Sequence, residues 1–399
     1  MLNDKIISGW EHIKISDLTD VITGGTPSTK KNQYWDCGDI PWLPSGGCKD
    51  KEINTVTKFI TKEGLRNSAA KIMPINTVVI ALTGATTGKV GILNIEVSAN
   101  QSVTGIIPND KFIPKYMFYY LRSIRAKILH DSYGCAQKHI SQGYVKDLEI
   151  LLPPLETQKK ISEVLEKAER ALEKRKEVNR LMDEYLKSVF IEMFGDENAN
   201  VKLVNDVVQS IDAGWSVGGD ERKIEINEIA VLKISAVTKG IFDASKYKVI
   251  SKDIKIKKFL SCKYGDILFS RANTRELVGA SCIVDKDYDN LILPDKLWRI
   301  TVNEDLMTRE FFLYSINTDK VRKEISKLAT GTSGSMLNIS MAKFKKIELN
   351  VPSFKKQSTF SEIYLKINSI KEDVILNETQ MRSLFNSLMK DAFNGKLEF

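Results

Sequence analysis

The sequence repeats itself at a constant offset of 199 residues, half of its 399-residue length. The segment HIS at 139–141 matches NIS at 338–340, and the register then holds without a gap for more than 50 residues. The pairs in register include Gln158 and Gln357, Glu163 and Glu362, Ser188 and Ser387, and Phe194 and Phe393. A chance match would drift out of register, so the chain is predicted to consist of two equivalent halves.

In both copies the matched segment follows a proline and continues with helix-forming residues for about 40 positions, which predicts a helix about 60 Å long. Apolar residues recur at alternating steps of four and three, the spacing of a coiled-coil seam. A single helix with such an apolar stripe would by default be a core helix. Two such helices in one chain are best explained by antiparallel packing of their stripes on each other, rather than on separate partners. The predicted helix-pair interface consists of Ile161, Leu165, Leu172, Arg175, Met182, Leu186, Phe360, Ile367, Glu378, Met381 and Phe385.

The register of this pair is predicted from charge. Aligning Ile161 with Ala392 places Arg175 opposite Glu378 in the middle of the seam. An unpaired charge would be costly there, so these two side chains are expected to face each other.

Each long helix is preceded by about 140 residues with strand and turn signals. Strands are predicted at 39–43 and 77–82, and at 229–234 and 266–270, with shorter helices at 115–128 and 308–325. The predicted fold class is α+β, with two α/β domains separated by two long antiparallel helices in a coiled coil and a pseudo-twofold internal repeat. The predicted boundaries are 1–152, 153–196, 197–351 and 352–399.

Charge is unevenly distributed over these parts. The chain has 59 Lys and Arg against 51 Asp and Glu, a net charge of +8. Residues 1–152 hold 18 basic and 14 acidic side chains and residues 200–337 hold 22 and 19, whereas residues 153–199 hold 9 and 11. A nucleic acid is therefore expected to bind the two globular parts rather than the first long helix.

Several loops are candidates for contact with nucleic acid. The loop at 83–91 resembles a Walker A loop, but it has three residues between its glycines instead of four and Val90 after the lysine, so a turn between strands is the plainer interpretation. The loop at 270–275 carries guanidinium and amide groups of the types that read guanine and adenine edges. The polar loops at 133–139 and 330–337 suit phosphate contacts. Ordinary solvent exposure would explain these residue types equally well.

The predicted DNA-binding residues combine these loops with two lysines near the N-terminus. They are Lys30, Lys31, Thr83, Thr86, Thr87, Lys89, Gln137, Lys138, Arg271, Asn273, Arg275, Ser333 and Ser335.

The sequence carries no recognisable catalytic constellation. Its three histidines have no triad signature, and its five cysteines have no C-x-x-C spacing, so neither a metal site nor a cofactor is predicted. It also has no run of 18 apolar residues and no secretion signal at the N-terminus, so a cytoplasmic protein is expected.

The segment HISQGYVKDLEILLPPLETQKKI at 139–161 closely resembles the end of a target-recognition domain and the start of the conserved helix in specificity subunits of type I restriction-modification enzymes. The segment GGTPS at 24–28 and the loop at 83–91 are also similar to the first such domain. The resemblance extends over the whole chain. The second copy departs from it, with SF at 353–354 where the first has PL at 154–155, and SML at 335–337 where the first has AQK.

The resemblance implies a non-catalytic subunit that binds double-stranded DNA. Each recognition domain would read one half of a split target, and the paired helices would set the gap. Two modification subunits would dock on the helices, bring S-adenosylmethionine and methylate adenine, and restriction subunits would join through the complex. Two other classes stay open: a coiled-coil scaffold that does not bind DNA, and an uncharacterised two-domain enzyme.

Overall fold

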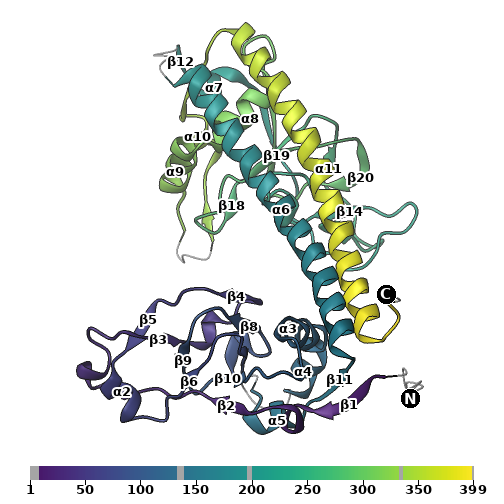
Figure 1. Ribbon diagram of the computed structural model, residues 1–399. Helices are drawn as coiled ribbons and strands as arrows, with labels where there is room; N and C mark the ends of the chain where they lie inside the picture. Colours follow the sequence, from purple (N-terminus) through teal and green to yellow (C-terminus); the bar gives the residue numbers. More distant parts are fainter. Residues whose placement is uncertain (1–8, 133–138, 196–199, 332–335, 398–399) are drawn as a thin grey trace. The chain divides into compact units, whose positions relative to one another are not determined.

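The computed structural model of the chain describes residues 9–132, 139–195, 200–331 and 336–397. It divides into two compact units, unit 1 with residues 1–178 and 375–399 and unit 2 with residues 179–374 (Figure 1). The boundary falls within the two longest helices, α6 (Leu155–Phe194) and α11 (Phe354–Phe393), of 40 residues each. Each unit therefore contains one globular part and a portion of both long helices.

The globular part of unit 1 is built on two sheets, with strand orders β2-β10-β7-β8-β4 and β5-β3-β9-β6. All four residues of the central strands β7 and β8 are buried, as their continuous apolar sequences VVIA and VGIL require. Helix α3 (Pro114–Ser123) packs on both. The strands are β2 (Val21–Thr23), β3 (Ile40–Leu43), β4 (Lys51–Ile53), β5 (Lys58–Ile60), β6 (Ile72–Met73), β7 (Val78–Ala81), β8 (Val90–Leu93), β9 (Val97–Ala99) and β10 (Val103–Ile106).

Unit 2 has almost the same topology, with strand orders β13-β21-β17-β19 and β15-β14-β20-β16. In both units the smaller sheet contains one parallel pair at the same place, β3 with β9 and β14 with β20. Among the described residues of unit 2, nothing corresponds to the edge strand β4. The strands are β13 (Val208–Ala213), β14 (Ala230–Leu232), β15 (Tyr247–Val249), β16 (Ser261–Cys262), β17 (Ile267–Ser270), β19 (Ser281–Ile283), β20 (Tyr288–Ile292) and β21 (Leu297–Val302).

One buried glutamine ties each globular part to its long helix. In unit 1 the Gln158 side chain accepts a hydrogen bond from the Ile113 backbone N–H (2.8 Å) and donates one to the Pro153 carbonyl (2.8 Å). In unit 2 Gln357 accepts from the Thr308 N–H (3.1 Å) and donates to the Pro352 carbonyl (2.9 Å). The residue type that matches at the 199-residue offset therefore makes the same bonds in both copies.

A two-stranded sheet closes each globular part by pairing its first and last strands. In unit 1 these are β1 (Glu11–Lys14) and β11 (Glu149–Leu152), and in unit 2 β12 (Val201–Leu203) and β23 (Glu348–Asn350), all antiparallel. The end of each globular part is thereby held beside its beginning, directly before the long helix starts.

The portions of α6 and α11 within a unit lie side by side (Figure 1). In unit 2 the Phe194 and Phe360 rings are 5.8 Å apart, and the Lys371 Nζ lies 2.6 Å from an Asp183 carboxylate oxygen. Later residues of α11 thus meet earlier residues of α6, so the two segments are antiparallel there. In unit 1 the early residue Ile161 shares one core with Ala392 near the end of α11.

The shorter helices differ from the sequence prediction, because each is broken in two. The stretch predicted at 115–128 forms α3 and α4 (Arg125–Asp131), and the one predicted at 308–325 forms α8 (Arg309–Asn317) and α9 (Asp319–Leu328). At the breaks, the Ser123 and Thr318 hydroxyls donate to backbone carbonyls three residues earlier (2.6 and 2.8 Å). Such bonds compete with the helical pattern, and the backbone of Thr318 is extended.

Candidate nucleic-acid interface

The loop at 83–89 connects two antiparallel strands of unit 1, β7 and β8, as expected for a turn rather than for a Walker A loop. Hydrogen bonds within the loop fix its shape: the Thr87 hydroxyl donates to the Gly84 carbonyl (2.8 Å) and the Thr86 hydroxyl to the Thr83 carbonyl (3.3 Å). Thr87 is buried by these contacts. Lys89 is half-buried, and its ammonium group forms no ion pair with any described residue.

The loop ends on a glycine that packs against a helix. Gly88 has a φ of +73°, and a Cβ added there would come within 3.3 Å of Ile128 and 3.6 Å of Arg125 on α4. The Arg125 guanidinium donates to Asp50 (2.9 Å), and the other oxygen of that carboxylate accepts from the Val90 backbone N–H (3.1 Å). The loop base is therefore clamped by one arginine and one aspartate.

Unit 2 has the equivalent loop between β17 and β19, longer by two residues. It ends on Gly279, whose φ is +83° and whose added Cβ would lie 2.5 Å from Arg322 and 2.8 Å from Ile325 on α9. Here the arginine donates to a carbonyl of the loop itself, that of Glu276 (2.9 Å). Burial lowers the pKa of Arg322.

In each unit a later segment pairs with the first residues of this loop. The Ile140 N–H donates to the Leu82 carbonyl (2.9 Å), and the Ile339 N–H donates to the Arg271 carbonyl (2.9 Å). Thr83 forms a bridge with His139, while β18 (Ala272–Asn273) pairs with β22 (Leu337–Asn338). The loops predicted at 133–139 and 330–337 thus end beside the loops predicted at 83–91 and 270–275.

The predicted DNA-binding residues of unit 2 differ in how far their side chains are engaged. The Arg271 guanidinium donates to the Asp295 carbonyl (2.8 Å) and carboxylate (3.3 Å). The Asn273 side chain binds the Thr274 N–H (2.9 Å) within its own loop. Arg275 is exposed, and its guanidinium forms no ion pair with any described residue. Arg275 is consequently the more available of the two arginines.

The remaining predicted residues lie elsewhere or outside the described residues. Lys30 and Lys31 are exposed between β2 and a short turn, and a hydrogen bond from Lys31 to the Tyr34 hydroxyl (3.0 Å) raises the pKa of that lysine. No hydrogen bond or ion pair of the described residues joins either lysine to the loop at 83–89. Four predicted residues lie outside the described ranges: Gln137, Lys138, Ser333 and Ser335.

The eleven predicted helix-interface residues are all buried or half-buried. Glu378, however, forms its ion pair with Arg382 in the next turn of α11 (2.9 Å), and among the described residues no ion pair joins it to Arg175. That expected charge pair is therefore not formed. Both side chains keep partial access to solvent, so neither charge pays the desolvation free energy that would favour a buried ion pair between them.

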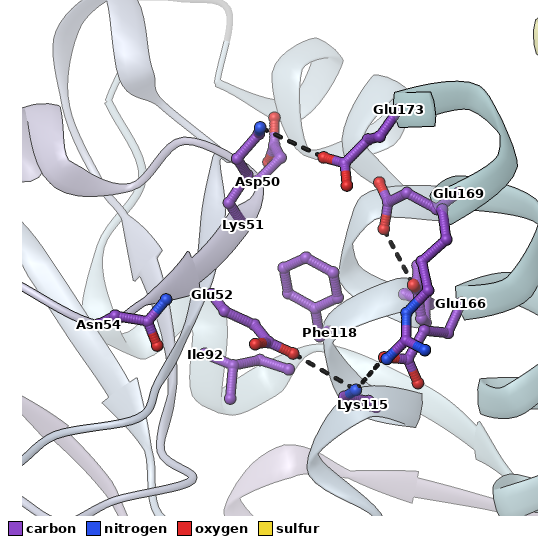
Figure 2. Close-up of a pocket in the computed structure, with 12 residues that line it drawn as sticks. Asp50, Lys51, Glu52, Asn54, Ile92, Lys115, Phe118, Glu166, Glu169 and Glu173 are labelled. Carbon is purple, nitrogen blue, oxygen red and sulfur yellow. Dashed lines mark hydrogen bonds and ion pairs between the residues drawn. The ribbon is translucent and has the colours of Figure 1, made fainter. Parts of the chain in front are cut away.

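A second candidate site is a charged pocket of about 290 Å³ in unit 1, between β4, α3 and α6 (Figure 2). Lys115 of α3 bridges Glu52 (3.3 Å) and Glu166, and Lys51 of β4 lies 3.2 Å from Glu173. The pKa of Glu166 is lowered, and the main cause is the hydrogen bond that Lys115 donates to its carboxylate. These ion pairs attach the sheet and α3 to the long helix.

The same wall of the pocket carries a bidentate ion pair. The Arg122 guanidinium donates to both oxygens of Glu169 (2.7 and 3.1 Å), which also accepts from the Tyr119 hydroxyl (2.9 Å). The Arg122 guanidinium carbon lies over the Phe385 ring of α11, 5.9 Å from the ring centroid. Arg122 therefore connects α3 to both long helices within unit 1.

Several of these residues were not predicted from the sequence, notably Arg125, Arg322 and the charged pocket. A signal existed for the first two, because Gly88 and Gly279 follow equivalent strands at an offset of 191 residues, and each arginine precedes an isoleucine by three positions. This offset of 191 residues differs from the offset of 199 residues that relates the long helices. A comparison of the two halves at the offset of 199 alone therefore does not align Gly88 with Gly279.

The described residues contain no group of three or more His, Cys, Asp or Glu side chains arranged to hold a metal ion. Of the described helices, none is both long and apolar enough to cross a membrane.

Comparison with known proteins agrees with the architecture. Residues 7–181 match the family described as type I restriction modification DNA specificity domain. The chain is 26% identical to the MjaIX type I restriction enzyme specificity subunit of Methanocaldococcus jannaschii, over 99% of this chain and 94% of that protein. It is 21% identical to the MjaVIII specificity subunit of the same organism, over 98% and 94%.

Two solved structures share the fold. The S subunit of a type I restriction-modification system from M. genitalium aligns with a TM-score of 0.61 at 15% identity, over 98% of both chains. A chain from a structure that describes assembly and conformational transition of the type I R-M system aligns with a TM-score of 0.55 at 15% identity, over 98% of this chain and 100% of that one. Residues 7–181 therefore match a type I restriction modification DNA specificity domain, and the chain is similar over nearly its full length to specificity subunits of type I restriction-modification systems. The resemblance predicted from residues 139–161 is confirmed.

Proposed function

We propose that this specificity subunit reads a bipartite DNA target, one half with the loop at 83–89 and the other with the loop at 271–278. The observation that supports this division is that one chain builds the same loop base twice, with a left-handed glycine packed on an arginine and an isoleucine. A firmly held loop can present side chains to DNA with little loss of conformational entropy.

The two loops would use different chemistry. Lys89 offers a point charge beside hydroxyl groups, which suits a phosphate oxygen. Arg275 offers a guanidinium that has no ion pair among the described residues, which suits either a phosphate or the two acceptors of a guanine edge. Arg271 would act differently, because its guanidinium is held by Asp295 and supports the loop unless DNA displaces that carboxylate.

The long helices would act as the frame of the subunit. We infer that α6 and α11 form an antiparallel coiled coil related by an internal twofold, and that this frame sets the unspecified gap between the half-targets. The matched bonds of Gln158 and Gln357 support equivalent attachment of both recognition domains to the frame. The domain boundaries would then be 1–152, 153–196, 197–351 and 352–399.

Exposed apolar residues on the long helices support docking of two modification subunits there. In unit 2, Leu181 and Tyr185 of α6 lie one turn apart and are 49% and 54% exposed, and Ile370 of α11 is 46% exposed. Large apolar side chains on a helix surface are typical of protein interfaces. The modification subunits would supply S-adenosylmethionine and methylate adenine, and restriction subunits would join through the complex.

The direct test is to express the chain with its modification subunit and to map methylated adenines in the host genome. A split motif is expected, and exchange of residues 200–337 with those of another specificity subunit should change one half of the motif only. A continuous motif, or a change in both halves after the exchange, would contradict the proposal.

A further inference from the structure

Unit 2 contains a pocket of about 420 Å³ at the place where unit 1 has its charged pocket. It is lined by β19, α8 and residues 364–372 of α11, which correspond to β8, α3 and residues 165–173 of α6. In unit 1 the edge strand β4 pairs with β8 and closes this space. Among the described residues of unit 2, no strand pairs with the corresponding edge of β19, so the pocket is larger.

The missing strand also removes a positive charge. By position after the equivalent strand and short turn, Lys51 of β4 corresponds to Gly240. Lys51 pairs with Glu173, whereas Glu372, the counterpart of Glu173, has no ion pair with a described residue. Gly240 offers no side chain, and no atom other than those of its chain neighbours lies within 4 Å of where its Cβ would stand.

The pocket is lined by three carboxylates, those of Asp285, Glu310 and Glu372. Its one basic residue, Arg309, is already paired with Glu304 (2.8 Å). Burial, with the negative charges of Asp285 and Asp373, raises the pKa of Glu372. The pocket therefore has acidic groups in excess, and its own side chains do not neutralise them.

Aromatic and aliphatic side chains surround these acids. Tyr264 is 68% exposed and Leu365 is 52% exposed, and Phe242 lines the same space. Aromatic faces attract cations, and exposed apolar groups lose contact with water when a partner covers them. The carboxylates are not grouped closely enough for a metal ion, since the described residues hold no such cluster. A long side chain with a cationic end fits this combination.

We propose that this pocket receives an arginine or lysine side chain of a modification subunit, and that this contact exists at unit 2 only. The inference rests on the proposed function, because it places the partner on a pocket wall formed by α11. The partner's cation would take the role that Lys51 has in unit 1, pairing with Glu372, while Tyr264 and Phe242 would pack against its aliphatic stem. The two docking positions on this subunit are therefore chemically unequal.

The test is a titration of the full-length chain with its modification subunit, with binding of the first and second copies resolved by mass photometry. Glu372→Lys would occupy the pocket with the chain's own cation, and weaker binding of one copy by about tenfold or more is expected. Glu362→Lys changes the same charge at an exposed position of the same helix outside the pocket and is the matched control, with binding close to that of the unchanged chain. Thermal unfolding of each variant verifies that it is folded.

The outcomes separate the inference from the proposed function. If the unchanged chain bound no modification subunit, both would fail. If the unchanged chain bound two copies and Glu372→Lys bound both equally well, or if Glu362→Lys had the same effect as Glu372→Lys, the inference alone would fail. Stabilisation of the chain by spermidine that Glu372→Lys abolished, with subunit binding unaltered, would assign the pocket to a free cation and would also overturn the inference.

Discussion

The two units attach a similar sheet to a similar helix by different means. In unit 1 the junction is a network of ion pairs in which Lys115, Arg122 and Lys51 meet the glutamates of α6. In unit 2 the positions on α11 that correspond to these glutamates are Leu365, Asn368 and Glu372, of which none forms an ion pair with a described residue, and the junction is a cluster of aromatic rings around Phe360. What is common to both is the buried glutamine at the start of each long helix.

This difference separates the contacts that both halves of the repeat share from the contacts that vary between them. The glutamine satisfies backbone groups that would otherwise be buried without a partner, because its side-chain amide supplies both an acceptor for the N–H and a donor for the carbonyl. Charged and aromatic contacts, by contrast, are alternative ways to attach a sheet to a helix. Each of the following predictions tests whether a contact belongs to the common frame or to one unit.

The largest effect is expected from the aromatic cluster of unit 2. Phe360→Ala removes a fully buried ring that contacts Phe190, Phe194 and Tyr314, so a loss of about 3–5 kcal/mol of stability is expected in unit 2. Hydrogen exchange measured by mass spectrometry would localise the loss. Phe354→Ala, at an exposed phenylalanine of the same helix, is the control, and an equal loss there would show that burial of the ring is not the cause.

The glutamines should behave alike in the two units. Gln158→Ala and Gln357→Ala each leave a backbone N–H and a carbonyl without their buried partner, and each should cost about 1–3 kcal/mol, the first in unit 1 and the second in unit 2. Gln380→Ala, at an exposed position of α11, should be nearly neutral. A large effect of only one of the two buried glutamines would break the equivalence of the halves.

The sequence predicts the long helices, the prolines before them and the matched glutamines. These features could be predicted because a strict helical period and an ungapped register persist over 40 residues. The sheets were predicted only in part. Strand β4 forms by pairing with β8, about 40 residues later in the chain, and such pairing cannot be read from the local sequence, nor can the lack of an equivalent strand among the described residues of unit 2. The loop residues Lys89 and Arg275 were identified from residue type alone. The arginines beneath them were not, because their role arises from contact with a glycine on another element.

The ion pair between Arg122 and Glu169 should matter in unit 1 alone. Glu169→Gln should lower the stability of unit 1 by about 1 kcal/mol, since the pair is partly exposed and therefore screened by solvent. The loss should shrink as salt is raised. Glu163→Gln, at an exposed position of α6, is the control in chemical denaturation at two salt concentrations. A loss that did not change with salt would argue that Glu169 acts by packing.

The smallest effect concerns pH, and its sign should differ between the two glutamates Glu166 and Glu372. The pKa of Glu166 is lowered in the folded chain, so its ionised form stabilises unit 1 above the ordinary value of 4.5, and this contribution is lost as pH falls below it. The pKa of Glu372 is raised, so the contribution of this side chain to the stability of unit 2 falls as pH rises from 4.5 through the folded value. Glu166→Gln should remove this contribution from unit 1 and Glu372→Gln that from unit 2, each seen as a difference from the unchanged chain in hydrogen exchange between pH 4 and 7.

The central claim, divided recognition, is tested most directly by selection from DNA randomised in both half-targets, with the assembled methyltransferase. Lys89→Ala should weaken binding or preference at one half only, and Arg275→Ala at the other, with the gap unchanged. A lost phosphate contact should lower the salt dependence of binding by about one unit of slope, whereas a lost guanine contact should cost about 1–3 kcal/mol at one base pair. If either substitution degraded both halves equally, or altered the gap, divided recognition would be contradicted.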